Sequence, residues 1–342
     1  MSYTIHDIAA LAGVSKSTVS RVISGKGYTS EAARDRVLQA VAALQYKPNA
    51  IARAMASQRT HNIGVILYRE QQPIASHPVY GKMLDAILAE ASQLQYSVFV
   101  TTEREMSAKS ADFMMEQRVD GLILISRLSQ EVIGHIGSFG VPYIMVNGTT
   151  DKGDVVQLVN EDRTGGALVA EHLYEQGHRN VSIIAGPQAH RSHNLRFTGF
   201  CERMRELGGR IVPQLIHQSA TSAFMQGYEG VFSLWEPICA LKPTALFATN
   251  DALALGAMQA FWKQQWTVPE DIAVAGFDDT EHALMAVPPL TTVRVDTDRM
   301  GRDAVRLLHK LIQKESMERQ TVYQPRLIVR ESTALYKGEC SE

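Results

Sequence analysis

Two short helical patterns, separated by one glycine, stand near the start of the chain and restrict its fold more than any other feature. Residues 5–12 repeat apolar side chains at helical spacing, Gly13 interrupts the pattern, and residues 15–23 resume it. Ser15 can cap the second helix, because its hydroxyl oxygen can accept a hydrogen bond from an amide of the first turn. One side of that helix carries Val19, Val22 and Ile23, and the other carries Lys16, Ser17, Ser20 and Arg21. Two short helices joined by a tight turn predict a helix-turn-helix, whose second helix enters the major groove of DNA.

A third helix and a short alanine-rich segment follow. The helix begins after Ser30, and its apolar residues can close a small three-helix core. It ends before Pro48, which cannot continue a helix and restricts the residue before it. Residues 49–57 favour a helix, yet an isolated helix shorter than about a dozen residues is marginal in water. We therefore expect residues 49–57 to become helical only when another element holds them.

The first sixty residues resemble the LacI/GalR family of bacterial transcription repressors. The resemblance rests on residues 5–9, Gly13-Val14-Ser15, Thr18-Val19-Ser20-Arg21-Val22, Tyr46-Lys47-Pro48-Asn49 and Ala52-Arg53, and it continues to about Arg330. It implies a helix-turn-helix DNA-binding domain over residues 1–48, a hinge helix and linker over 49–61, a two-lobed effector-binding and dimerisation domain over 62–338, and a tail over 339–342.

The charge distribution separates the head from the rest of the chain. Residues 1–60 contain eight Lys and Arg against three Asp and Glu, a net charge of +5. Because the whole chain carries −2 at pH 7, the remainder carries −7. A basic head on an acidic body is the distribution expected of a DNA-reading module fused to a domain that does not contact DNA.

The sequence offers no sign of export or of a metal site. It shows no signal-peptide pattern and no apolar run near the ~18 residues that a membrane helix needs. Its cysteines are Cys201, Cys239 and Cys340. They are not spaced as metal ligands, so reduced thiols in a cytoplasmic protein explain them. His178, His190 and His193 are irregularly spaced and are interpreted as surface polar residues. We expect no metal and no cofactor.

After residue 62 the pattern changes to apolar strands that alternate with amphipathic helices. We predict strands over residues 63–67, 96–100, 121–125, 143–146, 181–186, 245–248, 272–277, 290–295 and 323–329, and helices over 80–94, 108–116, 164–176, 197–207, 223–234 and 252–266. Such alternation implies parallel sheets covered by helices on both faces. The pattern restarts at the helix over 164–176, which predicts two lobes with a ligand cleft at the carboxyl ends of the strands.

The expected fold class is therefore α/β. It combines an N-terminal three-helix helix-turn-helix head and a hinge helix with a two-lobed, periplasmic-binding-protein-like body of doubly wound parallel sheets. The resemblance further implies that the chain crosses between the lobes several times. The last two predicted strands, over residues 290–295 and 323–329, are each expected to return to one lobe.

Arg196, Asn250 and Asp278 are the main candidates for effector contacts. Each follows a predicted strand of the second lobe, with Arg196 at the mouth of a helix, and the resemblance implies effector contacts for all three. A planar Arg donor together with carboxylate and amide acceptors can bind vicinal hydroxyls, each of which donates and accepts a hydrogen bond. We interpret Asp251 as the cap of the next helix and Asp279 as a structural residue.

Three further residues complete the predicted effector site. Tyr80 lies where the family places an aromatic residue at the cleft edge, although a core residue at a helix start fits equally well. Ser126 ends a strand of the first lobe, and Phe224 stands near Ser222, where many family members have an aromatic residue. Sugars are the commonest effectors of the family, with purines and nucleosides in the minority. A sugar or sugar derivative is the expected effector, and a purine or nucleoside is the alternative.

The predicted DNA contacts fall into three groups. Those facing base edges, all on the polar side of the second helix, are Lys16, Ser17 and Arg21. Arg21 can hold a guanine through O6 and N7, a pair worth about 1–3 kcal/mol of discrimination. Those contacting phosphates are Thr4, Thr18, Ser30 and Asn49, and His6 can contact either group. In the hinge segment, Ala52 belongs to a small apolar face, and Met55 is predicted to wedge into a minor-groove step.

One head cannot hold its own hinge segment, whereas two hinge segments side by side on DNA can. The chain is therefore expected to act as a homodimer that reads a pseudo-palindromic operator. Movement of the lobes shifts the hinge starts near residues 59–62, so that both DNA and effector bias hinge folding. A coupling free energy of about 1–3 kcal/mol changes operator affinity by roughly one to two orders of magnitude.

Two other classes of protein fit the sequence less well. A periplasmic binding protein shares the two-lobed body, but it needs a signal peptide where this chain has a helix-turn-helix. An enzyme would rely on Asp278, Asp279 and the histidines, but the sequence shows no nucleophile–base pair, phosphate loop or metal set. We therefore predict a DNA-binding transcription regulator with no enzymatic activity and no membrane contact.

Overall fold

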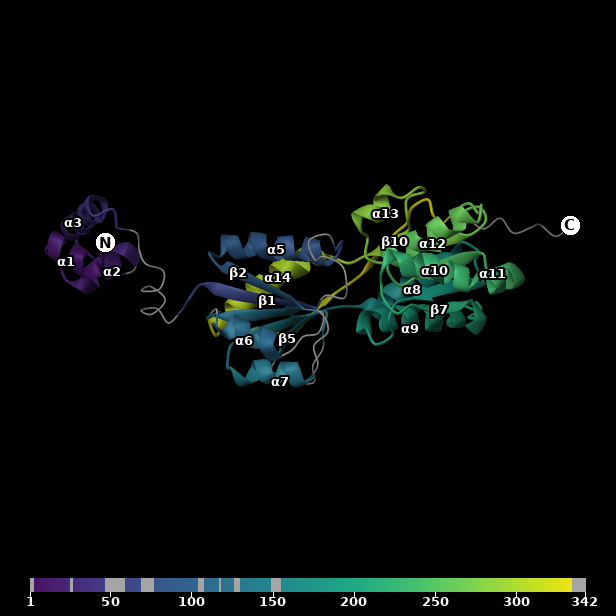
Figure 1. Ribbon diagram of the computed structural model, residues 1–342, viewed down its shortest axis with the longest axis horizontal. Helices are drawn as coiled ribbons and strands as arrows, with labels where there is room; N and C mark the ends of the chain where they lie inside the picture. Colours follow the sequence, from purple (N-terminus) through teal and green to yellow (C-terminus); the bar gives the residue numbers. More distant parts are fainter. Residues whose placement is uncertain are drawn as a thin grey trace. The chain divides into compact units, whose positions relative to one another are not determined.

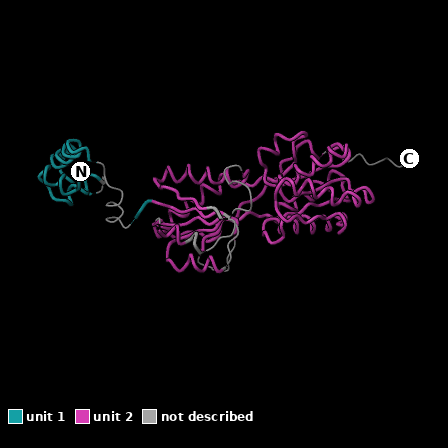
Figure 2. The backbone as a smooth tube through the Cα atoms, viewed as in Figure 1, with its two compact units in different colours: residues 1–61 teal, residues 62–342 magenta. Residues whose placement is uncertain are grey.

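A computed structural model divides the chain into two compact units, residues 1–61 and residues 62–342 (Figure 2). The structure describes residues 3–24, 27–46, 59–68, 77–103, 108–116, 118–125, 130–148 and 155–333. The predicted hinge segment, the candidate effector residue Ser126 and the predicted tail lie outside these residues.

The first unit is a bundle of α1 (Ile5–Ala12), α2 (Lys16–Ser24) and α3 (Glu31–Ala43). Gly13 joins α1 to α2 with a φ of 62°, a left-handed conformation that glycine adopts without a steric penalty. Ile8, Val19 and Val37 are fully buried and bring the three helices together, with alanines of α1 and α3 filling the space between them. The predicted helix-turn-helix is confirmed, and its apolar side forms the core of this unit.

The second unit has two lobes, and we call the one that begins at Asn62 the first lobe. Its elements are β1 (Asn62–Tyr68), α5 (Tyr80–Gln93), β2 (Ser97–Glu103), α6 (Ala108–Glu116), β3 (Gly121–Ile125), α7 (Gln130–Ser138), β4 (Tyr143–Val146), β5 (Val156–Asn160), α14 (Thr297–Ile312) and β11 (Gln320–Tyr323). The six strands form a sheet in the order β11-β5-β4-β3-β1-β2, with every neighbouring pair parallel.

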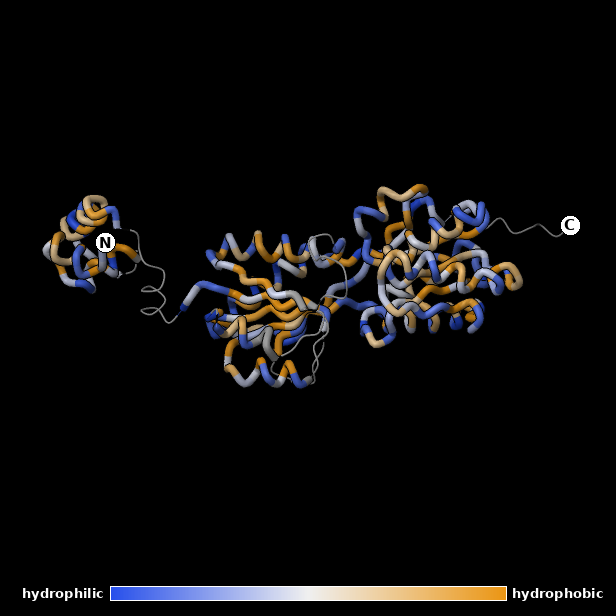
Figure 3. The backbone as a smooth tube through the Cα atoms, in the orientation of Figure 1, coloured by the Kyte–Doolittle hydropathy of each residue, from blue (hydrophilic) through white to orange (hydrophobic). Residues whose placement is uncertain are grey.

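Alternate side chains of these strands pack on opposite faces of the sheet. Val65 belongs to the cluster that includes residues of α5 and α14, whereas Ile66 belongs to the cluster that includes residues of α6 and α7. Figure 1 shows the corresponding helix pairs on the two faces, and Figure 3 shows the hydrophobic residues concentrated along the strands. The predicted parallel sheet with helices on both faces is confirmed.

The second lobe repeats this architecture with a smaller sheet. Its elements are α8 (Asp162–Glu175), β6 (Val181–Ala185), α9 (Arg191–Glu206), the 3-10 turn η2 (Pro213–Leu215), β7 (Ile216–Gln218), α10 (Phe224–Ser233), α11 (Trp235–Leu241), β8 (Ala245–Ala248), α12 (Asp251–Lys263), β9 (Ala273–Ala275), α13 (Glu281–Met285), β10 (Thr292–Arg294) and β12 (Arg326–Ile328). Four parallel strands lie in the order β7-β6-β8-β9, and β10 pairs antiparallel with β12.

Within the described residues, the chain passes between the lobes three times. The first crossover joins β5 to α8, the second joins β10 to α14, and the third joins β11 to β12. The backbone also links two of them, because the Glu161 amide donates to the Tyr323 carbonyl at 3.1 Å. The three crossovers are therefore the connections about which the lobes can move relative to each other.

Several element boundaries differ from those predicted. The strand predicted over residues 323–329 is two strands in different lobes, because Pro325 lies between them and cannot donate to a sheet. The helix predicted over 197–207 begins six residues earlier, at Arg191. Short elements with weak patterns were missed, namely α7, β5, η2, β7, α11 and α13. The sixteen-residue α14 carries a clear helical pattern that the prediction also missed.

Among the described residues, no helix is both long enough and apolar enough to cross a bilayer. The same residues contain no group of three or more His, Cys, Asp or Glu side chains placed to hold a metal ion.

Candidate DNA-contact surface and effector site

The polar side of α2 is open to solvent. Lys16, Ser17 and Arg21 are all exposed, as the predicted base contacts require. Ser15 caps the helix as predicted, since its hydroxyl accepts a hydrogen bond from the Thr18 amide at 3.2 Å. The Thr18 hydroxyl lies 2.9 Å from the Ser15 hydroxyl. Thr18 therefore supports the helix start, in addition to its predicted phosphate contact.

The predicted phosphate contacts Thr4 and Ser30 both stand at helix starts. The amide and the hydroxyl of Thr4 donate to Oδ2 of Asp7 at 2.7 and 2.8 Å, which forms a capping box for α1. These hydrogen bonds hold the pKa of Asp7 below its usual value. Ser30 is exposed and precedes α3, and His6 is exposed on α1. The remaining predicted DNA contacts, Asn49, Ala52 and Met55, lie outside the described residues.

Tyr28 is a candidate contact that the sequence patterns did not single out. It lies in the loop before α3 and is 89% exposed. A large aromatic side chain left in water on a small basic unit is typical of a binding residue. The prediction missed it because it belongs to neither helical pattern. Its position beside Gly27, in a loop between two helices, was the available signal.

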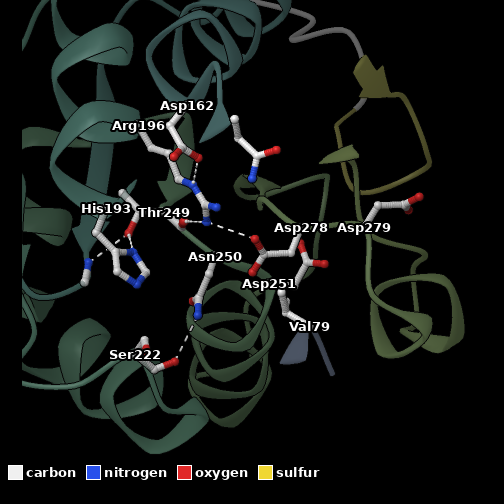
Figure 4. Close-up of polar contacts among 12 residues, drawn as sticks. Val79, Asp162, His193, Arg196, Ser222, Thr249, Asn250, Asp251, Asp278 and Asp279 are labelled. Carbon is white, nitrogen blue, oxygen red and sulfur yellow. Dashed lines mark hydrogen bonds and ion pairs between the residues drawn. The ribbon is translucent and has the colours of Figure 1, made fainter. Parts of the chain in front are cut away.

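Arg196 is the centre of a buried polar cluster in the second lobe (Figure 4). It lies in the second turn of α9, not at the mouth of the helix as predicted, because the helix begins at Arg191. Nε donates to Oδ1 of Asp162 at 2.8 Å, and Nη1 donates to Oδ1 of Asp278 at 2.9 Å and to the Thr249 carbonyl at 3.0 Å. Burial alone would lower the pKa of Arg196, but Asp278 and Asp162 outweigh it and raise the pKa.

Two glycines allow α8 and α9 to approach closely enough for the Asp162–Arg196 ion pair. A Cβ atom at Gly166 would stand 2.0 Å from the Arg196 carbonyl oxygen, and one at Gly199 would stand 2.0 Å from the Arg163 carbonyl oxygen. Any larger side chain would push the helices apart. The close crossing therefore sets the position of Arg196.

Asp278 follows β9 and completes the pair with Arg196. Burial raises its pKa to about 6, although the neighbouring Arg196 charge lowers it. Its φ of 118° is a conformation that a side chain other than hydrogen makes costly. Within the described residues, Oδ2 of Asp278 and Nη2 of Arg196 make no hydrogen bond, so one acceptor and one donor stand beside each other.

Asn250 takes the capping role that the sequence assigned to Asp251. Asn250, and not Asp251, caps α12, because its Oδ1 accepts from the Leu253 amide at 2.9 Å. Its Nδ2 donates to the Ser222 carbonyl at 3.0 Å. Asp251 is the first residue of α12 and is buried, and its carboxylate accepts from the Thr280 amide at 2.7 Å and from a threonine hydroxyl at 2.5 Å. The cap prediction for Asp251 is wrong, because the backbone places its side chain toward the loop after β9.

The environments of Asp251 and Asp279 shift their pKa values in opposite directions. Burial and the Asp278 charge raise the pKa of Asp251 to about 7. Asp279 has the opposite environment, since the hydrogen bonds from Arg330 and Arg294 overcome burial and lower its pKa. Asp279 pairs with these two arginines at 2.5 Å each and points away from the cluster (Figure 4), which agrees with the structural role expected from the sequence.

The prediction that His178 and His193 are surface residues is wrong. His178 and His193 are only 2% and 5% exposed. His193 Nδ1 lies 2.8 Å from the Thr249 hydroxyl, which also accepts from the Gly186 amide at 2.8 Å. A Cβ atom at Gly186 would stand 2.6 Å from that imidazole nitrogen. The glycine at the strand end therefore makes room for a buried histidine, which the irregular spacing of histidines could not reveal.

The first lobe contributes the start of α5. Tyr80 begins this helix and stacks on His77, with ring centroids 4.5 Å apart, and it also packs on the hydrophobic core. His77 Nδ1 accepts from the Val79 and Tyr80 amides at 3.3 and 3.2 Å, and burial lowers the His77 pKa to about 4. Tyr80 thus makes the core contacts expected of a residue at a helix start, which was one of the two roles that fitted its position.

A cavity of about 310 Å³ lies between the two lobes. Its lining comes from the start of α5 and from the segments around α13 and the start of α14, and it includes His77, Val79, Asp278, Asp279, Arg294 and Asp296. Among the described residues, Asp278 is the one predicted effector residue that lines it. Arg196 and Asn250 adjoin Asp278 from the second lobe, Phe224 is half-buried at the start of α10, and Ser126 lies outside the described residues.

The sequence analysis also did not predict a hydrogen-bonded pair of asparagines in the first lobe. Asn147 directly follows β4, Asn160 ends β5, and Nδ2 of Asn160 donates to Oδ1 of Asn147 at 3.0 Å. Both residues stand at the carboxyl ends of parallel strands, where ligands bind in such sheets. The signal was available for Asn147, which follows the predicted strand 143–146, but β5 itself was not predicted.

Comparisons with known proteins agree with both units. The family "Bacterial regulatory proteins, lacI family" matches residues 4–49, and the "Periplasmic binding protein-like domain" matches residues 170–333. The ribose operon repressor of Escherichia coli is 32% identical over 337 residues, which cover 96% of this chain and 99% of that protein. The repressor PurR of Pasteurella multocida is 30% identical over 337 residues, with 96% and 98% covered.

The structure of this chain is similar to a solved structure over nearly its whole length. The crystal structure of the lac repressor dimer bound to operator and the anti-inducer ONPF has a TM-score of 0.83 and 28% identity, and the match covers 98% of this chain and 100% of that chain. A helix-turn-helix head followed by two parallel-sheet lobes defines a class of bacterial transcription regulators. The chain belongs to the lacI family. It is a DNA-binding transcriptional regulator controlled by a small-molecule effector, and not an enzyme.

Proposed function

We propose that the effector is a neutral sugar or sugar derivative held between the lobes. The observation that carries this proposal is the Arg196–Asp278 ion pair, in which Nη2 of Arg196 and Oδ2 of Asp278 make no hydrogen bond among the described residues. A hydroxyl group both donates and accepts, so two neighbouring hydroxyls of a sugar match this pair. The Arg196 guanidinium lies 3.8 Å from the centre of the Phe277 ring. This cation–π contact helps to fix the position of the guanidinium.

The charge of the cluster favours a neutral effector. The carboxylates of Asp162 and Asp278 both pair with the single positive charge of Arg196, so the cluster carries more negative than positive charge. An anionic ligand would add to this negative charge in a site of low dielectric constant. Free sugars are therefore favoured over sugar phosphates and nucleotides.

The similar proteins support either of two effector classes. The name of the Escherichia coli relative refers to a ribose operon, whereas PurR is the alternative that would imply a purine or nucleoside. Aromatic stacking on both sides of a ligand would favour the purine class. Phe224 is half-buried and available for one such face, but the Tyr80 ring is stacked on His77. We therefore prefer a sugar.

The chain is further proposed to bind operator DNA as a homodimer. The second lobe leaves large apolar side chains in solvent on α10, α12 and in and after α13, namely Met225, Trp262, Leu284, Met285 and Val287. Element α12 packs on both α10 and α13, so these side chains lie on or next to adjoining helices of the second lobe. Exposed apolar residues on adjoining elements are typical of an interface, and the lac repressor relative is a dimer.

In this dimer, each head would read one operator half-site through the polar side of α2. Lys16, Ser17 and Arg21 would contact base edges, while Thr4, Thr18, Ser30 and Asn49 contact phosphates. His6 would contact either group. The predicted roles of Ala52 and Met55 in a DNA-dependent hinge remain part of the proposal. A regulator of chromosomal operators works in the cytoplasm, and this is the proposed location.

The effector class is tested by thermal unfolding of the full chain against a panel of ligands. The panel contains D-ribose, D-galactose, D-glucose, cellobiose, ribose 5-phosphate, hypoxanthine, guanine and adenosine. A ligand at about a hundred times its dissociation constant adds about 2.7 kcal/mol to the stability of the folded state. We expect a shift with one neutral sugar and its close analogues.

Two variants tie that shift to the proposed site. Asp278→Asn removes the acceptor charge and should abolish the shift, whereas Glu171→Gln, which breaks an exposed ion pair with Arg203 on the same lobe, should leave it unchanged. A shift with purines or nucleosides alone would overturn the sugar proposal. An equal sugar shift in Asp278→Asn would overturn the proposed site.

A further inference from the structure

Ion pairs join the proposed effector site to the first and second crossovers between the lobes and to the end of β12, the strand that follows the third crossover. Asp162 directly follows the first crossover and pairs with Arg196 at 2.8 Å. Arg294, the last residue of β10, stands before the second crossover, and Arg330 follows β12 after the third. Asp279 pairs with both of these arginines, through Oδ2 with Arg294 and through Oδ1 with Arg330. Its neighbour in sequence is Asp278, the proposed effector contact.

The turn that carries Asp278 is strained and is held by its surroundings. Asp278 has a φ of 118° and Asp279 a φ of 54°, so two consecutive residues with side chains have positive φ. The Asp278 amide donates to the Val293 carbonyl at 2.8 Å, and the Asp279 amide donates to the Thr292 hydroxyl at 3.3 Å. Strained conformations of this kind persist only where neighbouring contacts hold them, and they occur at functional sites.

The Asp279 ion pairs are shielded enough to provide that hold. The Asp279 side chain is 8% exposed and that of Arg330 is 13% exposed. Arg330 is itself fixed, because its Nη1 donates to the Leu290 carbonyl at 2.8 Å. Charge-assisted hydrogen bonds between buried groups are stronger than those on an open surface. The second partner, Arg294, is 55% exposed, so the pair with Arg330 is the stronger constraint.

We propose that Asp279 is a positioning residue, which locks the strained Asp278 turn to the second crossover through Arg294 and to the end of β12, the strand that follows the third crossover, through Arg330. Occupancy of the effector site and the angle between the lobes then change together. This inference rests on the proposed effector site, because Asp278 gains its functional meaning from it. Asp279 itself contacts no effector in this scheme. It converts a local displacement of Asp278 into a movement of the chain segments that connect the lobes.

The test measures the distance between the lobes in the absence of any sugar or DNA. Spin labels are placed on the exposed native Cys239 of α11 and on Glu116→Cys of α6, in a Cys340→Ser background that leaves the buried Cys201 unlabelled. Labelled chains are mixed with an excess of unlabelled chains, so that only distances within one chain contribute to the pulsed electron resonance signal.

Asp279→Asn is the decisive variant, because asparagine tolerates the positive φ of this position while the charge is lost. We expect a broader distance distribution than in the wild type and about tenfold faster hydrogen exchange of the Asp278 amide. Arg330→Met should reproduce both effects, and the double variant should add little to either single variant. Glu171→Gln is the matched control, since it removes one charge from the same lobe without touching a crossover.

The outcomes separate positioning from general support of the fold. A residue that only stabilises the lobe would lower the unfolding midpoint of Asp279→Asn and leave the distance distribution of the folded protein unchanged, and that result would overturn the inference. Additive effects of Asp279→Asn and Arg330→Met would also overturn it. Because no ligand is used, a failure of the sugar panel leaves this test intact, and a failure of this test leaves the sugar panel intact.

Discussion

The contact residues of the head and those of the second lobe differ in how they are held. On α2, Lys16, Ser17 and Arg21 are exposed side chains of a three-helix bundle whose core lies on the opposite side of the helix. In the second lobe, Arg196 and Asp278 are buried, paired with each other and tied to neighbouring elements. The first group can be replaced without disturbing the fold, whereas the second is part of the fold.

This difference separates two kinds of experiment. Substitutions on α2 should change DNA affinity and leave stability nearly constant, because surface changes away from special features usually alter stability by less than about 0.5 kcal/mol. Substitutions in the buried cluster should change stability and effector binding together, because each one leaves another charge without its partner. The following predictions test that contrast, from the largest effect to the smallest.

Arg196→Met should destabilise the second unit by about 3–5 kcal/mol, because it leaves Asp162 and Asp278 buried without their cation. Denaturant unfolding followed by tryptophan fluorescence measures this, since all three tryptophans of the chain, Trp235, Trp262 and Trp266, lie in the second lobe. Arg203→Met is the control, because its ion pairs are solvent-exposed and contribute little to stability. Equal losses in the two variants would contradict the buried-cluster account.

Asp251 should make stability depend on pH. Its folded-state pKa is raised to about 7, so the folded chain keeps a proton that the unfolded chain releases at lower pH. That contribution is fully present below the unfolded pKa of about 4 and is lost as pH rises through about 7, with a slope of up to about 1.4 kcal/mol per pH unit for one proton. Asp251→Asn should remove this contribution and make the slope shallower, while Asp278, whose pKa is raised to about 6, still contributes in the same direction.

The measurement is the difference in unfolding free energy between the wild type and Asp251→Asn at several pH values. His77, whose pKa is lowered to about 4, contributes in the opposite direction because its stability is lost as pH falls below its unfolded value. It is present in both proteins and cancels in the difference. A difference that stays constant from pH 5 to 8 would show that Asp251 is ionised throughout this range.

Arg21→Ala should weaken binding to a selected operator by about 1–3 kcal/mol, because a base contact is lost. The operator is selected from a random duplex library, and fluorescence anisotropy gives the affinity for selected and random DNA. Arg34→Ala on α3 is the matched control and should weaken both DNAs alike. Equal losses on both DNAs for Arg21→Ala would place Arg21 among the phosphate contacts instead.

Thr4→Ala should destabilise the first helix by about 1 kcal/mol, because the hydrogen bond from the Thr4 hydroxyl to Asp7 is lost while that from the backbone amide remains. Hydrogen exchange of the α1 amides in the full chain measures this effect, and the second lobe should be unaffected. Thr4→Ser keeps the hydroxyl and the amide, so it should behave as the wild type. Unchanged exchange in Thr4→Ala would mean that packing of Ile8, and not the cap, holds the start of the helix.

The sequence predicted the fold well where patterns are long and local. The head, four strands of the first-lobe sheet (β1 to β4) and most helices of the second unit follow from apolar spacing alone, whereas β5 and α14 were missed. The sequence failed where tertiary context decides. Residues 323–329 look like one strand, but their two halves pair with strands in different lobes. No local pattern records which sheet a strand joins.

The effector cluster shows the same limit at the level of single residues. Arg196 and Asp278 stand out in the sequence because they follow strands and match the family, and the structure brings them into contact. The third partner, Asp162, was not predicted as a site residue, because its role depends on the close approach of α8 and α9 at Gly166. Which of the adjacent residues Asn250 and Asp251 caps α12 depends on the backbone geometry at the start of the helix, and the sequence does not reveal that geometry.

The central claim is that the Arg196–Asp278 pair couples effector binding to operator binding. The most direct measurement titrates the selected operator with wild-type protein and with Asp278→Asn, each with and without the sugar that shifts thermal unfolding. We predict that the sugar changes wild-type operator affinity by about 5–150-fold. Asp278→Asn should bind the operator as tightly as the wild type without sugar and should not respond to it. A full response to the sugar in Asp278→Asn would contradict the account.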